Sequence, residues 1–185
     1  GINITDEFMA AIRDGLMFAL CSPKTNEVLR EVDARQLWQR ILETRLQTGE
    51  PYLLFIDAVN RALPKHQRQL GLKVSTSNLC SEITLPTGMD HRDQERTAVC
   101  CLSSLNIETW DEWNDQPGFI EDVLRMLDNV LTHFITVAPD EMSRARYSAL
   151  RERSVGLGVM GFHSFLQARS IPFESALAKS WNMKI

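Results

Sequence analysis

The sequence predicts an α/β fold, in which short extended segments alternate with amphipathic helices. Residues 34–48 and 118–137 carry apolar side chains at helical spacing, whereas residues 74–85 and 97–107 have the composition of extended segments. Hydrophobic residues make up 44% of the 185 positions, which is enough for a core. We find no repeat, no low-complexity tract and no linker, so we expect a single domain over residues 1–185.

The chain begins with a polar stretch and then a helix that Thr5 or Asp6 would cap. The apolar side of this helix is formed by Phe8, Ile12 and Leu16. Residues 22–26 are predicted to form a turn, and residues 28–32 a short extended piece. This part is therefore expected to give one helix followed by one strand.

The next segment predicts a strong helix over residues 34–48. Asp33 precedes it as a capping residue, and Gly49 ends it. Its inward side chains are expected to be Leu37, Ile41 and Leu42. Residues 51–62 are apolar and stop before Pro64, which allows a strand or a helix; we favour a strand followed by a helix.

Two polar loops are expected in the middle of the chain, at residues 64–73 and 86–96. Residues 74–85 lie between them and contain β-branched and polar side chains, so we expect them to be extended. A second extended stretch is predicted at residues 97–107.

A long helix is predicted over residues 118–137, opened by Pro117 or Gly118. Another helix should follow Pro139. The apolar side of the long helix is core rather than a cofactor site, and its members are Val123, Leu127, Val130, Leu131 and Phe134. The glycine-rich stretch at residues 153–161 then leads into the helical sequence F-H-S-F-L-Q-A.

The glycines from Gly156 to Gly161 match the pattern G-x-G-x-x-G of dinucleotide-binding proteins. That fingerprint requires a buried strand before it and an acidic residue about 20 positions later. Here R-E-R-S-V precedes the glycines, and the nearest acid, Glu174, stands 13 residues after Gly161. We therefore expect these glycines to permit a tight strand-to-helix turn.

Composition excludes several classes of function. The net charge of −4 with mixed signs and no Lys/Arg run argues against nucleic-acid binding. No apolar run approaches the length of a membrane helix, and the polar start does not resemble a signal peptide. The histidines show no metal-ligand spacing, so no metal site is expected. The four cysteines do not form a secreted disulfide pattern, which indicates a cytoplasmic protein with reduced thiols.

The stretch S-N-L-C-S-E-I-T-L-P at residues 77–86 contains an amide, a thiol and a carboxylate two residues apart: Asn78, Cys80 and Glu82. In a strand these side chains would share one face and span roughly 13 Å, at ~3.3 Å per residue. An amide can hold a diol, and a carboxylate can accept the proton of a hydroxyl. The set could therefore bind a polyol and act on it.

A nearby carboxylate should raise the pKa of the Cys80 thiol and disfavour a thiolate. That expectation favours chemistry that starts from the neutral thiol. The structural alternative is a small buried cysteine between solvated Asn78 and Glu82 side chains, and spacing alone does not exclude it.

Four blocks resemble the large (α) subunit of class I ribonucleotide reductase. S-N-L-C-S-E-I-T-L-P-T is similar to its active-site finger loop, and A-V-C-C-L-S-S-L-N-I at residues 98–107 resembles its next strand, of the form A-x-C-x-L-x-S-x-N. G-E-P-Y-L-L-F-I-D-A-V-N and R-S-V-G-L-G-V-M-G, at residues 49–60 and 153–161, add support in the same order. The resemblance implies a partial segment of a ten-stranded α/β barrel with an active-site finger loop, cut from a longer protein.

This resemblance implies reduction of ribonucleotides, with diphosphates expected, to 2′-deoxyribonucleotides as DNA precursors. Cys80 would carry the thiyl radical, Glu82 would be the base for the 3′-hydroxyl, and Asn78 would hydrogen-bond the ribose hydroxyls. The substrate would contact all of Asn78, Leu79, Cys80, Ser81 and Glu82. Cys100 would be one half of a redox dithiol whose other cysteine lies upstream and is absent here, so the segment alone should not turn over.

The two remaining cysteines, Cys21 and Cys101, are not expected to take part in the reaction. Cys101 falls at a variable position of the pattern and is interpreted as spectator packing, and Cys21 as structural. Strand alternation should point Cys100 and Cys101 to opposite faces, and a vicinal disulfide would be strained.

The family further implies several partners and cofactors. These are a radical-generating small (β) subunit with a metal-radical cofactor, thioredoxin or glutaredoxin as reductant, and a homodimer of the full-length chain. ATP and deoxynucleotide effectors would bind elsewhere in the full chain, and this segment itself is expected to bind no cofactor.

Two alternatives stay open at this point. One is an adenosylcobalamin-dependent ribonucleotide reductase. The other is a non-catalytic thiol redox or structural α/β module, in which Cys80 would approach Cys100 as a simple dithiol.

Overall fold

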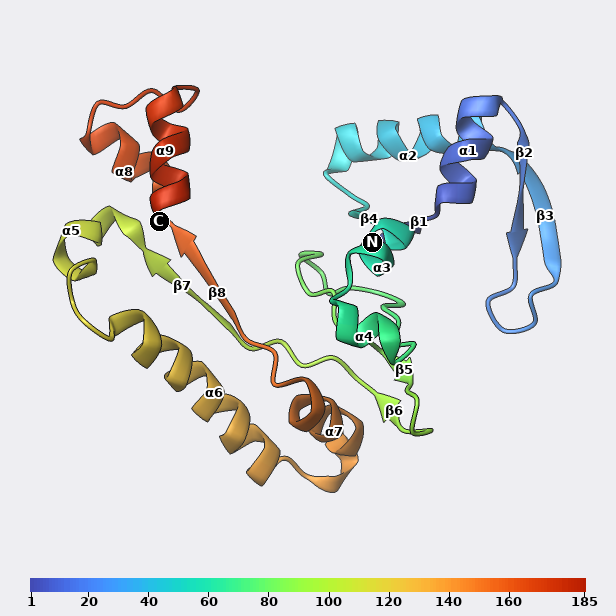
Figure 1. Ribbon diagram of the computed structural model, residues 1–185. Coiled ribbons are helices and arrows are strands. Elements are labelled where there is room, and N and C mark those ends of the chain that lie inside the picture. Colours follow the sequence, from blue (N-terminus) through green and yellow to red (C-terminus); the bar gives the residue numbers. More distant parts are fainter. The chain divides into compact units, whose positions relative to one another are not determined.

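A computed structural model describes residues 1–185, and the chain divides into two compact units, Gly1–Ala98 and Val99–Ile185 (Figure 1). Each unit is a mixture of helices and short strands, as an α/β segment requires, and no closed barrel is present. The single domain expected over residues 1–185 stays a prediction, because two compact units can belong to one larger barrel.

The first unit is built around two parallel strands, β1 (Ile2–Ile4) and β4 (Leu53–Phe55). Parallel neighbours need a crossover connection, and here it contains α1 (Asp6–Asp14), an antiparallel hairpin and α2 (Ala34–Thr48). The hairpin strands are β2 (Met17–Cys21) and β3 (Val28–Asp33). The core of this unit is formed by Ile4, Phe8, Ala11, Ala34 and Ile41.

Predicted caps account for both helices of this crossover. The Thr5 hydroxyl accepts a hydrogen bond from the Phe8 amide at 3.1 Å, and the Asp33 carboxylate accepts one from the Gln36 amide at 2.9 Å. Left-handed Gly15 ends α1, so Leu16 lies outside the helix and is 55% exposed, against expectation. Leu42, also expected inside, is exposed as well. The sequence prediction also missed β2.

The rest of the first unit is mostly loop. The predicted strand and helix of residues 51–62 are confirmed as β4 and α3 (Ile56–Ala62). The loops expected at 64–73 and 86–96 contain regular structure, namely α4 (Lys65–Gln69) and the hairpin β5 (Gly88–Met89) and β6 (Glu95–Arg96). A buried ion pair between Asp90 and Arg96 closes this hairpin at 2.9 Å.

The second unit repeats the parallel arrangement with β7 (Leu102–Asn106) and β8 (Gly156–Met160). After β7 come the 3-10 turn η1 (Ile107–Thr109) and α5 (Trp110–Trp113). The connection continues through α6 (Phe119–Val137), the 3-10 turn η2 (Asp140–Met142) and α7 (Ser143–Glu152). The chain then ends with α8 (Phe162–Ala168) and α9 (Ala176–Lys184). The predicted long helix and its successor are therefore confirmed.

Glycine is required at the turn from β8 to α8. Gly161 has φ +80°, and a Cβ atom there would stand 2.6 Å from the Asn106 side-chain oxygen. The glycine-rich segment thus contains β8 and a tight turn from this strand into α8. The predicted strand-to-helix turn is confirmed.

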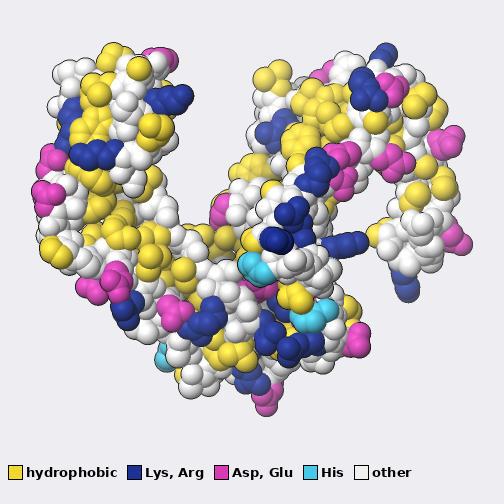
Figure 2. Space-filling view, viewed as in Figure 1, with side chains coloured by type: hydrophobic (Ala, Val, Ile, Leu, Met, Phe, Trp, Pro, Cys, Tyr) yellow, Lys and Arg dark blue, Asp and Glu magenta, His cyan; other side chains and the backbone are white.

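Apolar side chains are exposed on both units, and hydrophobic atoms lie open on the visible face (Figure 2). On α6 the exposed members are Ile120, Leu124, Met126, Val130 and Val137. Val130 therefore lies outside the core, against expectation. Such surfaces are typical of a segment whose sheets and helices belong to a larger barrel. None of the helices combines the length and apolar character needed to cross a membrane.

The core of the second unit depends on Phe165, which is fully buried with Ile107 and Leu166. Phe165→Ala should lower the free energy of unfolding by about 3–5 kcal/mol, because it removes an aromatic ring from a packed site. Urea unfolding followed by tryptophan fluorescence would measure this, since Trp110 and Trp181 contact Phe165. Phe173→Ala is the matched control, because Phe173 is 61% exposed and its loss should cost less than about 1 kcal/mol. Equal losses in the two variants would contradict this assignment of the core.

Candidate active site

The segment from residue 73 to residue 87, which we call the finger loop, is closed at its base by its own backbone and hydroxyl groups. The Thr87 amide donates to the Lys73 carbonyl at 3.0 Å, and the Ser75 and Thr87 hydroxyls hydrogen-bond each other. Val74 and Pro86 are buried beside this closure. The two ends of the loop therefore meet at one place in the first unit, and the residues between them lie beyond this closed base.

The tip of the finger loop is a turn, which corrects the prediction that residues 74–85 are extended. The Ser81 amide donates to the Asn78 carbonyl at 3.1 Å, and Ser81 has φ +64°, in the left-handed region. Asn78, Cys80 and Glu82 are therefore not aligned on one face of a strand.

Local side-chain hydrogen bonds explain why the turn replaces the strand. The Asn78 side-chain oxygen accepts from the Ile83 amide at 3.1 Å, and the Ser77 hydroxyl donates to the Ile83 carbonyl at 2.7 Å. Ser and Asn side chains compete with sheet pairing in this way. Both polar groups of the Ile83 backbone are satisfied inside the loop, so this residue needs no partner from a neighbouring strand.

The side chains at the tip are available to a ligand. Asn78, Leu79, Cys80 and Glu82 are all exposed. With its oxygen bonded to Ile83, the Asn78 amide has its nitrogen left to donate, which suits a hydroxyl acceptor. The tip therefore offers a thiol, a carboxylate and an amide donor within one turn.

A cavity of about 150 Å³ lies beside this turn, in the first unit. Its lining includes Asn78, Leu79 and Ser81 of the predicted substrate-binding set, together with Asn3 of β1. Cys80 and Glu82 of the same set do not line it. The structure thus brings three of the five predicted residues to a common cavity.

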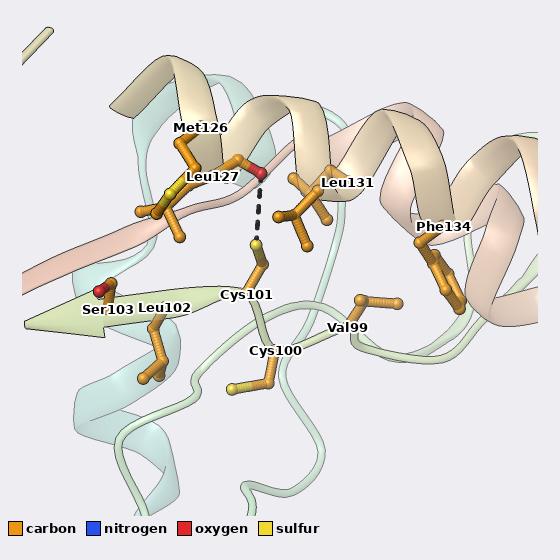
Figure 3. A pocket seen from close by; sticks show the side chains of 10 residues that line it. Val99, Cys100, Cys101, Leu102, Ser103, Met126, Leu127, Leu131 and Phe134 are labelled. Atoms are coloured by element: carbon orange, nitrogen blue, oxygen red, sulfur yellow. Dashed lines mark hydrogen bonds between the residues drawn. The ribbon is translucent and has the colours of Figure 1, made fainter. Parts of the chain in front are cut away.

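Cys100 and Cys101 lie near the start of the second unit, just before β7. Cys101 points toward α6, where its thiol hydrogen-bonds the Leu127 carbonyl at 3.5 Å, whereas the Cys100 side chain points the other way and is exposed (Figure 3). The opposite orientation predicted from strand alternation is therefore observed. Both residues line an apolar cavity of about 430 Å³ against α6.

The two thiols differ in exposure, because Cys101 is partly buried and Cys100 is exposed. Desolvation raises the pKa of the Cys101 thiol, and the neighbouring Cys100 and Asp128 raise it further. Cys101 packs on the α6 backbone, and its spectator role stays a prediction.

The four cysteines are all free thiols. Cys21 is exposed at the end of β2 and makes only a long contact of 4.0 Å to the Ala19 carbonyl. Cys21 and Cys80 belong to the first unit, and Cys100 belongs to the second. No group of three or more His, Cys, Asp or Glu side chains is placed to hold a metal ion.

The sequence analysis missed the residues that hold the finger loop from outside. Asn60 of α3 hydrogen-bonds the Val74 backbone, and Asn3 of β1 donates to the Ser75 carbonyl at 2.8 Å. The one available signal was an asparagine inside the otherwise apolar stretch of residues 51–62.

Comparisons with protein families, with other sequences and with solved structures all match ribonucleotide reductases. The family model described as ribonucleotide reductase, barrel domain, matches residues 1–185. The chain is 50% identical over 178 residues to a putative ribonucleoside-diphosphate reductase large subunit of Frog virus 3, covering 95% of this chain and 30% of that protein. It is 34% identical over 165 residues to the ribonucleoside-diphosphate reductase large chain of Schizosaccharomyces pombe, covering 88% of this chain and 19% of that protein.

Among solved structures, the class Id ribonucleotide reductase alpha subunit of Actinobacillus ureae matches with a TM-score of 0.78 and 35% identity. The match covers 98% of this chain and 31% of that one. The chain thus spans less than a third of the length of these relatives.

The raised pKa of Cys101 predicts a pH dependence of alkylation. Only the thiolate reacts, and burial disfavours it, so the rate-versus-pH curve of Cys101 in the folded protein should lie at higher pH than that of the unfolded chain. Mass spectrometry of iodoacetamide-treated Cys100→Ser protein would measure this without interference from the neighbouring thiol. Curves that coincide would show that Cys101 is not desolvated.

Proposed function

The chain belongs to the ribonucleotide reductase barrel-domain family, and on that premise we propose that it carries the part of the active site that reduces a ribonucleoside diphosphate to its 2′-deoxy form. The observation that carries the proposal is the exposed turn at residues 78–82, which presents the Cys80 thiol beside Glu82 and the Asn78 amide. The relatives are named as large subunits or large chains of ribonucleoside-diphosphate reductases.

In the proposed reaction, Cys80 as a thiyl radical takes the hydrogen atom from C3′ of the ribose and becomes a thiol. Glu82 accepts the proton of the 3′-hydroxyl, and the 2′-hydroxyl takes up one proton and leaves as water. The proton taken by Glu82 balances the proton that leaves in the water. Asn78 holds the ribose hydroxyls through its free amide nitrogen. This role agrees with the expectation of a neutral thiol, because a hydrogen-atom carrier must cycle between S–H and the sulfur radical.

The loss of water must be followed by a two-electron reduction. In the proposal, Cys100 and a second cysteine from outside residues 1–185 supply two electrons and two protons and close to a disulfide. The Cys80 S–H then returns its hydrogen atom to C3′, which restores the thiyl radical. The balance is a ribonucleotide plus a dithiol giving a deoxyribonucleotide, a disulfide and water. Residues 1–185 alone should therefore not turn over.

The wider assembly follows from the family. We propose that the full-length protein works with a small subunit that generates the radical with a metal cofactor. Thioredoxin or glutaredoxin would reopen the disulfide, and ATP and deoxynucleotides would act as effectors outside this segment. A homodimer and a cytoplasmic location belong to the same proposal. The relatives named above do not favour a cobalamin-dependent enzyme or a non-catalytic thiol module.

Cys80→Ser in the full-length protein should abolish nucleotide reduction, because a hydroxyl cannot replace the thiol as a hydrogen-atom carrier. The expected fall in kcat is at least about a thousandfold, the scale of losing an essential reacting group. Deoxynucleotide formation in the presence of the small subunit and a reductant measures it. Cys21→Ser is the control, since Cys21 is also exposed but lies in the β2–β3 hairpin. Reduction that survives Cys80→Ser would eliminate the radical-carrier role.

Cys100→Ser should block reduction, because only one electron-donating thiol would remain of the proposed pair. Cys101→Ser should leave deoxynucleotide formation close to that of the unaltered protein, because Cys101 is turned toward the α6 backbone. The same assay on both variants decides between the two cysteines. The reverse pattern, with Cys101 essential and Cys100 dispensable, would refute the assignment.

A further inference from the structure

The finger loop is held from outside by one side chain that contacts its backbone in two places. The side-chain nitrogen Nδ2 of Asn60 donates to the Val74 backbone carbonyl at 2.9 Å. The side-chain oxygen Oδ1 of Asn60 accepts from the Val74 backbone amide at 2.9 Å. A side-chain amide that satisfies both polar groups of one residue copies the pairing of a neighbouring strand. Val74 is 2% exposed, so water does not replace these bonds easily.

Asn60 is itself fixed. Its side-chain nitrogen Nδ2 also donates to the Ile56 backbone carbonyl one turn earlier in α3, at 2.9 Å. Helix α3 follows directly from β4, which pairs with β1 in the sheet of the first unit. Asn3 of β1 adds a second anchor through the Ser75 carbonyl. The base of the finger loop is therefore tied to the sheet through two asparagines.

Beyond this base, the loop is stiffened by its own hydrogen bonds among Ser77, Asn78, Ser81 and Ile83. Because these bonds hold residues 77–83 together as one turn, we expect a displacement at Val74 to move the tip. We propose that Asn60 is a positioning residue, which sets the place of the Cys80 thiol through the Val74 backbone. This inference rests on the proposed function of Cys80, and Asn60 itself does not touch the substrate.

The consequence for catalysis follows from geometry. Hydrogen-atom transfer needs the sulfur and C3′ in close approach, and a misplacement of ~1 Å can cost about a hundredfold in rate. Substrate binding depends on several hydrogen bonds, so a shift of the same size should weaken binding less than it slows hydrogen-atom transfer. Loss of the Asn60 clamp should therefore lower kcat much more than it changes KM.

The test uses the full-length protein with its small subunit and compares Asn60→Leu with Asn60→Asp. Leu removes both bonds to Val74 at similar size, and we expect a fall in kcat of about a hundredfold. Asp keeps an acceptor for the Val74 amide, so its kcat should fall between those of Asn60→Leu and the unaltered protein. Asn114→Leu is the matched control, because it removes one local bond to the Trp110 carbonyl in the second unit.

A second readout does not depend on activity. Trypsin cleavage after Lys73 requires the Val74 backbone to leave Asn60, so Asn60→Leu should speed cleavage there at least tenfold and leave other sites unchanged. The same measurement on Asn60→Asp applies if the Leu variant does not fold.

The outcomes separate the inference from the function. Unaltered protein that forms no deoxynucleotide would refute the proposed function, and the inference with it. Asn60→Leu with kcat within twofold of the unaltered protein, or with no change in cleavage after Lys73, would overturn the positioning role alone. A fall in kcat equal to that of Asn114→Leu would do the same.

Discussion

The pairing of the Asn60 side chain with the Val74 backbone is the interaction on which the candidate site depends. It joins a loop without strands to a helix that starts at the end of β4. Every proposed reacting group of the first unit lies beyond this point in the loop, within residues 78–82. The loop needs this support because its other hydrogen bonds lie within the loop or close to its base. No strand pairs with the loop.

The two units share one arrangement of strands but place their cysteines differently. Each contains two adjacent parallel strands joined by a helical crossover, which is the repeating element of an α/β barrel. The first unit adds a loop that displays an exposed thiol. The second unit places Cys100 and Cys101 just before β7, with one thiol exposed and the other against α6. Two units with similar strand pairs thus carry thiols that differ in exposure.

Much of this arrangement could be predicted from local signals. The caps at Thr5 and Asp33, the helix over residues 34–48 and the strand before α3 follow from spacing and side-chain type. The extended assignment of residues 74–85 was wrong because β-branched residues favour strands on average, while Ser77 and Asn78 satisfied the backbone locally. The Asn60 clamp was missed because it pairs residues 14 positions apart, and only tertiary structure brings them together. The residues of the candidate site were predicted from the motif resemblance. The prediction that Asn78, Cys80 and Glu82 share one face of a strand was wrong, because these residues lie in a turn.

Asn60 holds Val74, and we infer that this makes the base of the finger loop rigid. Amide hydrogen exchange at Val74 in the unaltered protein tests this most directly, because that amide donates to Asn60 and is buried. We expect exchange far slower than in the same segment of the unfolded chain. Exchange at the unfolded rate would show that the loop is not anchored at this point, and the proposed placement of Cys80 would lose its physical basis.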